Sequence, residues 1–461
     1  MKHLHQILGF LIMGLGIFLV SCSDFLDEKP SKSIVIPTTI DDLQSILNSI
    51  DQVNSGDGLG LLLSDDIFMS DQGWLSLSTE IQEGYLWNKQ ISNSQGEIPS
   101  WSVAYGNIFR FNVVLDQAEK LVPRNEVEQA QLDQIVGTAL FLRAVKYFEL
   151  LELFTHPVIS DADLNKEGLP LMLELDFPTT KERSTIGEVY DQVIGDLTQA
   201  LDLLPSIGQD PLRPSKVAAY GYLARVYMQL GSHEQALFMA NQALELKAEL
   251  LDFNSIPALE SIPIPLYTLY PIPRFNQEVV FHYLAGSQTY MFSDQTFVNQ
   301  EVVDSYEEND IRKYLYFTAP DEQGRVNYLG SFSGDFWLFT GITTGELYLV
   351  KAEMLARIGR TEESLEALNR LLESRYYAGT FTPVELANED SILEVVLRER
   401  RKELVYRGYL RWSDMRRFLR DENWQGVVPR VINGATYSLG LDPENYYVDI
   451  PLNEQERNGA L

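Results

Sequence analysis

The amino-acid sequence predicts a mainly α-helical protein, in which helical hairpins stacked as an α-α superhelix carry an irregular, loop-rich lobe with a few short strands. Three observations support this fold class. Apolar residues recur three and four positions apart from about residue 100 to 250 and again from 341 to 420, whereas residues 253 to 340 lack this period. Two predicted helical hairpins, around Gly231 and Gly359, also have large and small residues at corresponding positions. Finally, 45% of the 461 residues are hydrophobic, which is enough to bury a large core.

Residues 1–21 are predicted to be a secretory signal peptide. Lys2 and two histidines precede an uncharged apolar run from Ile7 to Val20, the arrangement that such peptides share. The run has about 14 residues, fewer than the ~20 that a helix needs to cross a bilayer. This length favours a cleaved signal over a permanent transmembrane anchor.

Cys22 is the predicted lipidation site. It ends the segment Leu19-Val20-Ser21-Cys22, which resembles a bacterial lipobox, where a small residue before the cysteine permits cleavage and the thiol accepts diacylglycerol. It is also the only cysteine of the chain, so no internal disulfide can form after export. Several acyl chains on Cys22, at ~0.8 kcal/mol for each buried methylene, would hold the protein to membrane lipid through a tether over residues 22–45. The alternative is an ordinary signal peptide followed by an unrelated cysteine.

The next elements follow in chain order. Residues 30 to 100 read as irregular, because glycines lie among Ser, Asp and Gln. Helical spacing then predicts one helix from Trp101 to beyond Asn112 and a longer one from about Val127 to Phe154, which His156-Pro157 ends. Thr185 to Glu188 fits a capping box at the start of a further helix.

Two helical hairpins are predicted from their glycine stops. Ser215 caps a helix that stops at Gly231, and a partner helix follows from His233 to about Lys247. A second hairpin repeats this geometry around Gly359. Both place large and small residues as a tetratricopeptide repeat does, which lets the two helices approach closely. The residues that carry the pattern are Tyr220, Leu223, Ala224, Tyr227, Ala236, Ala240 and Ala243 in the first hairpin, and Tyr348, Ala352, Leu355, Ser364, Leu368 and Leu371 in the second.

The segment from 253 to 340 is predicted to be an insertion of loops and short strands over the helical scaffold. It is rich in Pro, Gly, Tyr and Phe and interrupts the repeats. Residues 341–420 return to a helical hairpin and end in a charged helix. Its charges recur every three or four positions, at Glu399, Arg400, Glu403, Arg407, Arg411 and Asp414. Such charges are expected to pair along one exposed face at ~0.2–1 kcal/mol per pair, which fixes helix packing without contacting ligand.

Composition argues against several classes of function. The formal net charge of -30 repels phosphate backbones, so no nucleic acid partner is expected. The histidines after the signal peptide do not lie at ligand spacing from one another, so neither a metal site nor a cofactor is predicted. The acid pairs Asp65-Asp66 and Glu307-Glu308 are interpreted as solvated surface, so no catalytic residue is predicted.

Exposed aromatic side chains in the non-helical segments are the candidate ligand-binding residues. They would stack on sugar faces while neighbouring Asn, Asp and Gln bind hydroxyl groups. The alternative is a packing role, because aromatic residues dominate cores. The candidates are Trp74, Trp87, Tyr290 and Trp337.

The order of these elements resembles the SusD/RagB family of nutrient-binding outer-membrane lipoproteins. The stretches that carry the resemblance are Cys22 to Pro30, Trp101 to Asn112 with Leu142-Arg143-Ala144, Arg183 to Pro205 with Ala224-Arg225-Val226-Tyr227, and Glu346 to Arg417. Acidic residues directly after Cys22 are similar to the surface-export signal of Bacteroidetes lipoproteins, which favours the outward face of the cell outer membrane. The resemblance divides the chain into an N-terminal SusD-like region over 46–250 and a C-terminal SusD/RagB region over 251–461.

The resemblance implies a protein with four tetratricopeptide-like hairpins that captures an oligosaccharide or another nutrient and delivers it to a TonB-dependent β-barrel transporter, with no chemistry of its own. Two other classes stay open from the residues alone. One is an envelope hydrolase that acts on glycans. The other is a protein-interaction scaffold, because tetratricopeptide hairpins bind peptides in their concave groove.

Overall fold

The structure is a computed structural model that describes residues 37–457, apart from 50–52, 57, 176–180, 258, 260–269, 287–288, 331, 336 and 386–390. The predicted signal peptide and Cys22 lie outside the described residues. Residues from Thr39 onward form one compact unit. No described helix is both long and apolar enough to cross a membrane.

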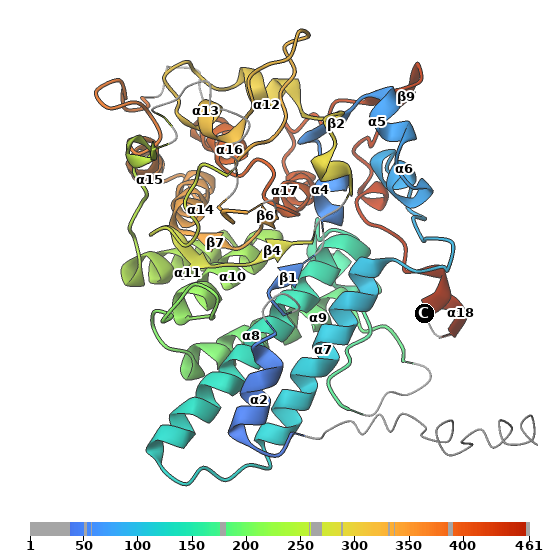
Figure 1. Cartoon of the computed structure of the whole chain (residues 1–461), viewed down its shortest axis with the longest axis vertical. Coiled ribbons are helices and arrows are strands. Elements are labelled where there is room, and N and C mark those ends of the chain that lie inside the picture. The colour runs from blue at the N-terminus through green and yellow to red at the C-terminus, as the bar shows by residue number, and fades with distance from the viewer. Residues whose placement is uncertain are drawn as a thin grey trace, which may run out of the picture. The chain divides into compact units, whose positions relative to one another are not determined.

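Long antiparallel helices dominate the chain between residues 99 and 372 (Figure 1). They are α7 (Pro99–Ala118), α8 (Glu126–Phe154), α9 (Ile186–Leu203), α10 (Lys216–Gln229), α11 (His233–Leu246), α14 (Thr344–Arg357) and α15 (Thr361–Leu372). Each pairs with its neighbour along the chain, and α11 lies against α14, so the second hairpin stacks on the first across the insertion. The mainly helical fold with tetratricopeptide-like hairpins is therefore confirmed.

Local sequence explains where these helices begin and end. Thr185 and Glu188 form the predicted capping box of α9, and the Ser215 hydroxyl accepts a hydrogen bond from the Ala218 amide at the start of α10. Gly231 and Gly359 follow α10 and α14 with φ of 71° and 78°. A residue that has a side chain is strained in this left-handed conformation, and glycine is not. Glycine therefore ends both helices.

The insertion forms the predicted lobe of loops and short strands, with two single-turn helices added. The strands are β3 (Val279–Phe281), β4 (Leu284–Ala285), β5 (Thr296–Val298) and β6 (Leu338–Phe339), and the helices are α12 (Gln300–Asp304) and α13 (Arg312–Tyr316). A further strand, β7 (Ile342–Thr343), follows directly after the predicted insertion and pairs with β3. Two strands pair with the N-terminal region: β4 lies between β1 (Ser55–Gly56) and β6, and β5 pairs with β2 (Ile67–Met69). The lobe thus joins segments more than two hundred residues apart.

The irregular region predicted over residues 30 to 100 contains more structure than expected. Its short helices are α2 (Ile40–Leu47), α4 (Leu59–Leu63), α5 (Asp71–Leu75) and α6 (Thr79–Tyr85). Thr39 and Asp42 form a capping box for α2, whose Leu43 and Leu47 are buried against α7 and α8. The tether predicted over 22–45 therefore overlaps the folded body at its end. The other three helices, α4, α5 and α6, are too short to show a clear helical period.

The prediction of a single charged helix at the end of residues 341–420 is wrong. The structure has two helices, α16 (Ile392–Glu403) and α17 (Leu410–Phe418), with Tyr406 and Gly408 between them in the left-handed region at φ of 58° and 55°. The chain ends with a β8–β9 hairpin (Arg430–Ile432 and Ala435–Tyr437) and α18 (Leu452–Arg457).

The charges of this segment are buried, and this also corrects the expectation of exposed pairs along one helix. Glu403 is 1% exposed and pairs with Arg375 and Arg312, which come from other elements. Arg400 on α16 pairs with Asp414 on α17 at 2.9 Å. Buried pairs such as these tie distant segments together, and removal of one partner leaves an uncompensated charge in the core.

Candidate functional site

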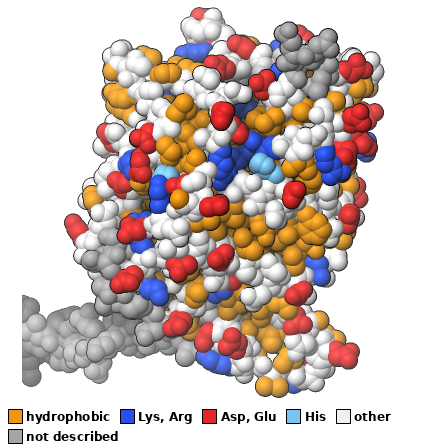
Figure 2. All heavy atoms as spheres, turned by 180° about the vertical axis from the view of Figure 1, so that it is seen from behind, with side chains coloured by type: hydrophobic (Ala, Val, Ile, Leu, Met, Phe, Trp, Pro, Cys, Tyr) orange, Lys and Arg blue, Asp and Glu red, His pale blue; other side chains and the backbone are white. Residues whose placement is uncertain are grey.

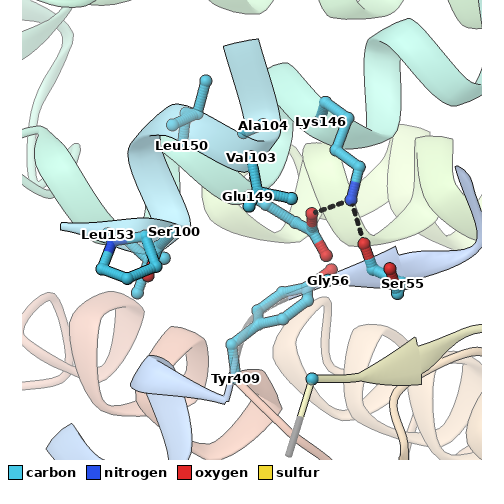
Figure 3. A pocket seen from close by; sticks show the side chains of 12 residues that line it. Ser55, Gly56, Ser100, Val103, Ala104, Lys146, Glu149, Leu150, Leu153 and Tyr409 are labelled. Atoms are coloured by element: carbon cyan, nitrogen blue, oxygen red, sulfur yellow. Dashed lines mark hydrogen bonds and ion pairs between the residues drawn. The ribbon is translucent and has the colours of Figure 1, made fainter. Parts of the chain in front are cut away.

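A cavity of about 220 Å³ opens between the start of α7, the C-terminal part of α8 and strand β1 (Figure 3). Its lining residues come from five separate segments of the chain. They are Ser55, Gly56, Pro99, Ser100, Val103, Ala104, Lys146, Glu149, Leu150, Leu153, Gly286 and Tyr409. The walls are mostly apolar, and one charged pair stands at the base, which is the usual composition of a small-ligand site.

The charged pair is formed by Lys146 and Glu149, one turn apart on α8. Lys146 Nζ lies 3.2 Å from Glu149 Oε2, and also donates to the carbonyl of Ser55 and to the hydroxyl of Tyr283. The Tyr283 hydroxyl in turn donates to Glu149 Oε2 at 2.9 Å. Burial and the nearby Glu149 carboxylate raise the pKa of Tyr283 well above its usual value, so the hydroxyl keeps its proton.

The second carboxylate oxygen of Glu149, Oε1, has no hydrogen-bond partner among the described residues. Glu149 is 7% exposed, so this oxygen is both buried and at the cavity wall. Figure 3 shows the carboxylate between Lys146 and the ring of Tyr409, next to Gly56. A β-carbon at Gly56 would overlap Glu149 Oε1, so only glycine fits this position with the carboxylate where it is.

Comparison with known proteins identifies the chain's relatives. Residues 24–228 match a family described as "SusD-like_3: Starch-binding associating with outer membrane", and residues 339–460 match the family described as "SusD family". The chain belongs to the SusD/RagB family. The resemblance inferred from the sequence motifs is thereby confirmed.

Relatives of this SusD family chain cover nearly its full length. "SusD-like protein P2" of Formosa agariphila is 25% identical over 519 aligned positions that cover 96% of each chain. A SusD superfamily protein from Bacteroides fragilis has the same fold with a TM-score of 0.72 and 19% identity, over 92% of this chain and 99% of that one. A structure named putative sugar binding protein, from Bacteroides vulgatus, has a TM-score of 0.71 and 22% identity over 92% and 98%. "Surface glycan-binding protein A" of Bacteroides fluxus has a TM-score of 0.65 and 18% identity over 91% and 97%.

Two of the four aromatic residues predicted to bind ligand belong to the core of this SusD family protein. Tyr290 is 0% exposed and its hydroxyl donates to the carbonyl of Gly58. Trp87 is 8% exposed, its Nε1 donates to the carbonyl of Leu63, and the guanidinium of Arg430 lies 4.0 Å from its ring centroid. Neither ring has a face free for a sugar, so both predictions are wrong. Each side chain is held by contacts that no sequence window shows.

Trp74 and Trp337 are partly exposed and stay predictions. Trp74 lies on α5, and its Nε1 donates to the carbonyl of Gln82 at 3.1 Å, which fixes the ring orientation. Trp337 precedes β6. Neither residue lines the cavity between α7 and α8, so the sequence prediction and the cavity identify different parts of the surface.

The acid pairs interpreted as solvated surface are engaged by cations in the structure. Asp65 accepts from Arg411 at 2.6 Å and from Arg401 at 3.0 Å; although burial opposes it, these guanidiniums hold the pKa of Asp65 well below its usual value. Burial raises the pKa of the neighbouring Asp66 to about 6, against the effect of Arg401. Both aspartates are buried, which corrects the surface interpretation.

The second acid pair, Glu307-Glu308, is exposed, as the surface interpretation expected, and each carboxylate pairs with a lysine. Glu307 pairs with Lys402 and Glu308 with Lys313. Within the described part of the chain, no group of three or more potential metal ligands comes together.

Sequence reasoning missed Lys146 and Glu149. A signal was present, because four charged residues, Arg143, Lys146, Glu149 and Glu152, interrupt an otherwise mostly apolar stretch from Gly137 to Phe154. Charged side chains are almost never fully buried unless they are paired, so charges three positions apart in such a stretch indicate paired sites. Their relation to Gly56 and Tyr283 was not visible, since those residues are distant in sequence.

Proposed function

We propose that this chain is a cell-surface lipoprotein that binds an oligosaccharide and delivers it to a TonB-dependent β-barrel transporter in the outer membrane. The observation that carries the binding role is the small cavity with apolar walls and a buried Glu149 carboxylate oxygen that has no hydrogen-bond partner among the described residues. Membership of a family described as starch-binding and associated with the outer membrane supports the glycan ligand and the location. Relatives named as sugar-binding and glycan-binding proteins point the same way.

Lipidation at Cys22 is part of the proposal. It rests on the lipobox and on the acidic residues that follow it. Metabolic labelling with palmitate tests it, because the wild type is expected to incorporate label and Cys22→Ser is expected to incorporate none. Label retained by Cys22→Ser would overturn the anchor.

Binding is favoured over hydrolysis of a glycan. Glycoside hydrolases use two carboxyl groups about 5 to 9.5 Å apart on either side of the scissile bond. Among the described residues that line the cavity, Glu149 is the one carboxylate, and it forms an ion pair with Lys146. The arrangement can hold a ligand but offers no acid and base pair for its cleavage.

A peptide-binding scaffold is also less favoured. The hairpin helices that face the lobe are covered by other parts of the chain, since β3, β7 and α17 contact α10 while α16 contacts α14 and α15. These contacts cover helix faces that a bare tetratricopeptide scaffold leaves open to peptides.

The test is calorimetric titration of soluble protein that begins after Cys22 against a panel of neutral and acidic polysaccharides and oligopeptides, with each mixture then assayed for new reducing ends. Saturable heat with intact glycan is the expected result. New reducing ends in proportion to protein would establish a hydrolase, and saturable heat with peptides alone would establish the scaffold. For the partner, a β-barrel of transporter size is expected to co-purify from outer membranes in mild detergent.

A further inference from the structure

We propose that the cavity between α7 and α8 receives a single uncharged sugar residue, at an end or branch of the glycan, and excludes uronic acids and amino sugars. This inference rests on the proposed glycan-binding function and adds which sugars the site selects. It is carried by the hydrogen-bond state of the buried pair Lys146 and Glu149 and by the size of the cavity.

The hydrogen bonds of the Lys146 and Glu149 pair leave one carboxylate oxygen, Glu149 Oε1, able to accept from a ligand. A lysine ammonium has three N–H donors, and Lys146 has three acceptors, namely the Ser55 carbonyl, Glu149 Oε2 and the Tyr283 hydroxyl. No donor of Lys146 is left for a ligand. Glu149 Oε1 still accepts, since nothing among the described residues donates to it. The ligand group at this point must therefore be a donor, which a sugar hydroxyl is.

The charges at the base already cancel. Lys146 is 1% exposed and Glu149 is 7% exposed, so the pair carries zero net charge in a site largely removed from water. A ligand carboxylate would lie beside Glu149 without a cation to donate to it, and would lose its hydration. A ligand ammonium would be attracted by Glu149 but repelled by Lys146 on the same carboxylate, so its hydration is again lost without full compensation. An uncharged hydroxyl avoids both costs.

The charge of the whole protein acts in the same direction for anionic glycans. The formal net charge is -30, and Figure 2 shows acidic side chains scattered over one whole face, with hydrophobic patches between them. A field of this sign disfavours the approach of polyanions at low ionic strength. The cavity and the surface therefore select against the same class of ligand.

The size of the cavity limits the ligand to one ring. Sites for drug-sized ligands have volumes of about 300–1,000 Å³, whereas this cavity has about 220 Å³. Its apolar side chains, among them Val103, Leu150 and Leu153, form a wall that suits the C–H face of a sugar ring. The remaining residues of the glycan would lie outside, beyond Val103, which is 53% exposed at the mouth.

The first test blocks the mouth of the cavity. Val103→Trp in the full-length chain fills the entrance without disturbing buried contacts, and is expected to weaken binding of a neutral oligosaccharide by about tenfold or more. The matched control is Val122→Trp, at a position 87% exposed and outside the cavity, for which the same affinity as the wild type is expected. Equal affinities for Val103→Trp and Val122→Trp would overturn the assignment of the cavity.

The second test measures charge selectivity. The probes are a neutral oligosaccharide, the same oligosaccharide with its terminal residue oxidised to the uronic acid, and its terminal amino-sugar counterpart. Wild type is expected to bind the neutral probe about tenfold more tightly than either charged probe. Glu149→Gln keeps an acceptor oxygen but leaves Lys146 uncompensated, so it is expected to shift preference toward the uronic acid probe.

The outcomes separate this inference from the proposed function. If the wild type binds none of the glycans, the proposed function fails. If it binds them and prefers a charged probe, only this inference fails. If Val103→Trp binds normally, this inference fails and the cavity is not the binding site, while glycan binding by the chain still stands. A Glu149→Gln variant that does not fold leaves the decision to Val103→Trp and to the wild-type selectivity.

Discussion

The ion pair between Arg225 and Glu346 joins the two tetratricopeptide-like hairpins, and its contribution to the free energy of unfolding can be measured. Arg225 on α10 donates from Nε and Nη2 to the two carboxylate oxygens of Glu346 on α14, each at 2.7 Å. The residues are 4% and 1% exposed. Although burial opposes it, Glu346 raises the pKa of Arg225 well above its usual value, so the guanidinium keeps its charge. Arg225 also donates to the carbonyls of Thr340 and Gly341.

Arg225→Met removes the cation and leaves the Glu346 carboxylate buried without a charge partner. Breaking a buried pair in this way costs about 3–5 kcal/mol of the free energy of unfolding. The Thr340 and Gly341 carbonyls also lose their donor, which places the expected loss at the upper end of that range. The converse variant, Glu346→Met, leaves a buried guanidinium and is expected to cost a similar amount.

The double variant distinguishes a specific pair from general disruption. With both partners replaced by methionine, no unpaired charge is buried, so the loss is expected to fall below the sum of the two single losses by about 2 kcal/mol or more. The measurement is equilibrium unfolding in denaturant, followed by helical circular dichroism. Arg370→Met is the control, since Arg370 and Glu373 are 60% and 67% exposed and 3.6 Å apart, and a loss below about 1 kcal/mol is expected. Additive losses, or an Arg225→Met loss no larger than that of the control, would refute the reasoning.

Three further predictions follow from single positions. Burial and the nearby Arg274 lower the pKa of His282 to about 4, so the unfolded chain binds a proton near pH 6.5 that the folded chain does not bind. About 3 kcal/mol of stability should therefore be lost as pH falls from about 6.5 to about 4. His282→Phe should flatten this dependence in unfolding measurements at several pH values. Gly359→Ala should cost about 1–2 kcal/mol of the free energy of unfolding in the same assay, because φ is 78° there, while nothing lies within 4 Å of the new carbon to cause a clash. Gly195→Ala, equally open but inside α9, should instead stabilise by about 0.5–1 kcal/mol. Equal effects at the two glycines would contradict the conformational argument. Trp87→Ala should destabilise by about 3–5 kcal/mol as a core residue does, whereas a loss of glycan affinity at unchanged stability would restore its predicted role as a ligand contact.

Local signals account for the helices that were predicted correctly. The α9 capping box at Thr185 and the stops at Gly231 and Gly359 depend on atoms within four residues of each other, so their meaning is the same in a peptide and in the folded protein. The break at Tyr406 and Gly408 had a local signal in the glycine, but helical spacing of the flanking charges concealed it.

The sequence by itself determined the helical hairpins and the family, because periodicity, caps and short motifs are properties of neighbouring residues. The lipid anchor at Cys22 stays a prediction from a motif of the same local kind. Only the tertiary structure decided which side chains are available to a ligand. Trp87 and Tyr290 are buried by segments from other parts of the chain, while Lys146 and Glu149 contact Tyr283 and Glu149 contacts Gly56, both distant in sequence. Burial and pairing depend on contacts between residues far apart in sequence, and one amino-acid sequence does not show which of these residues are close in space.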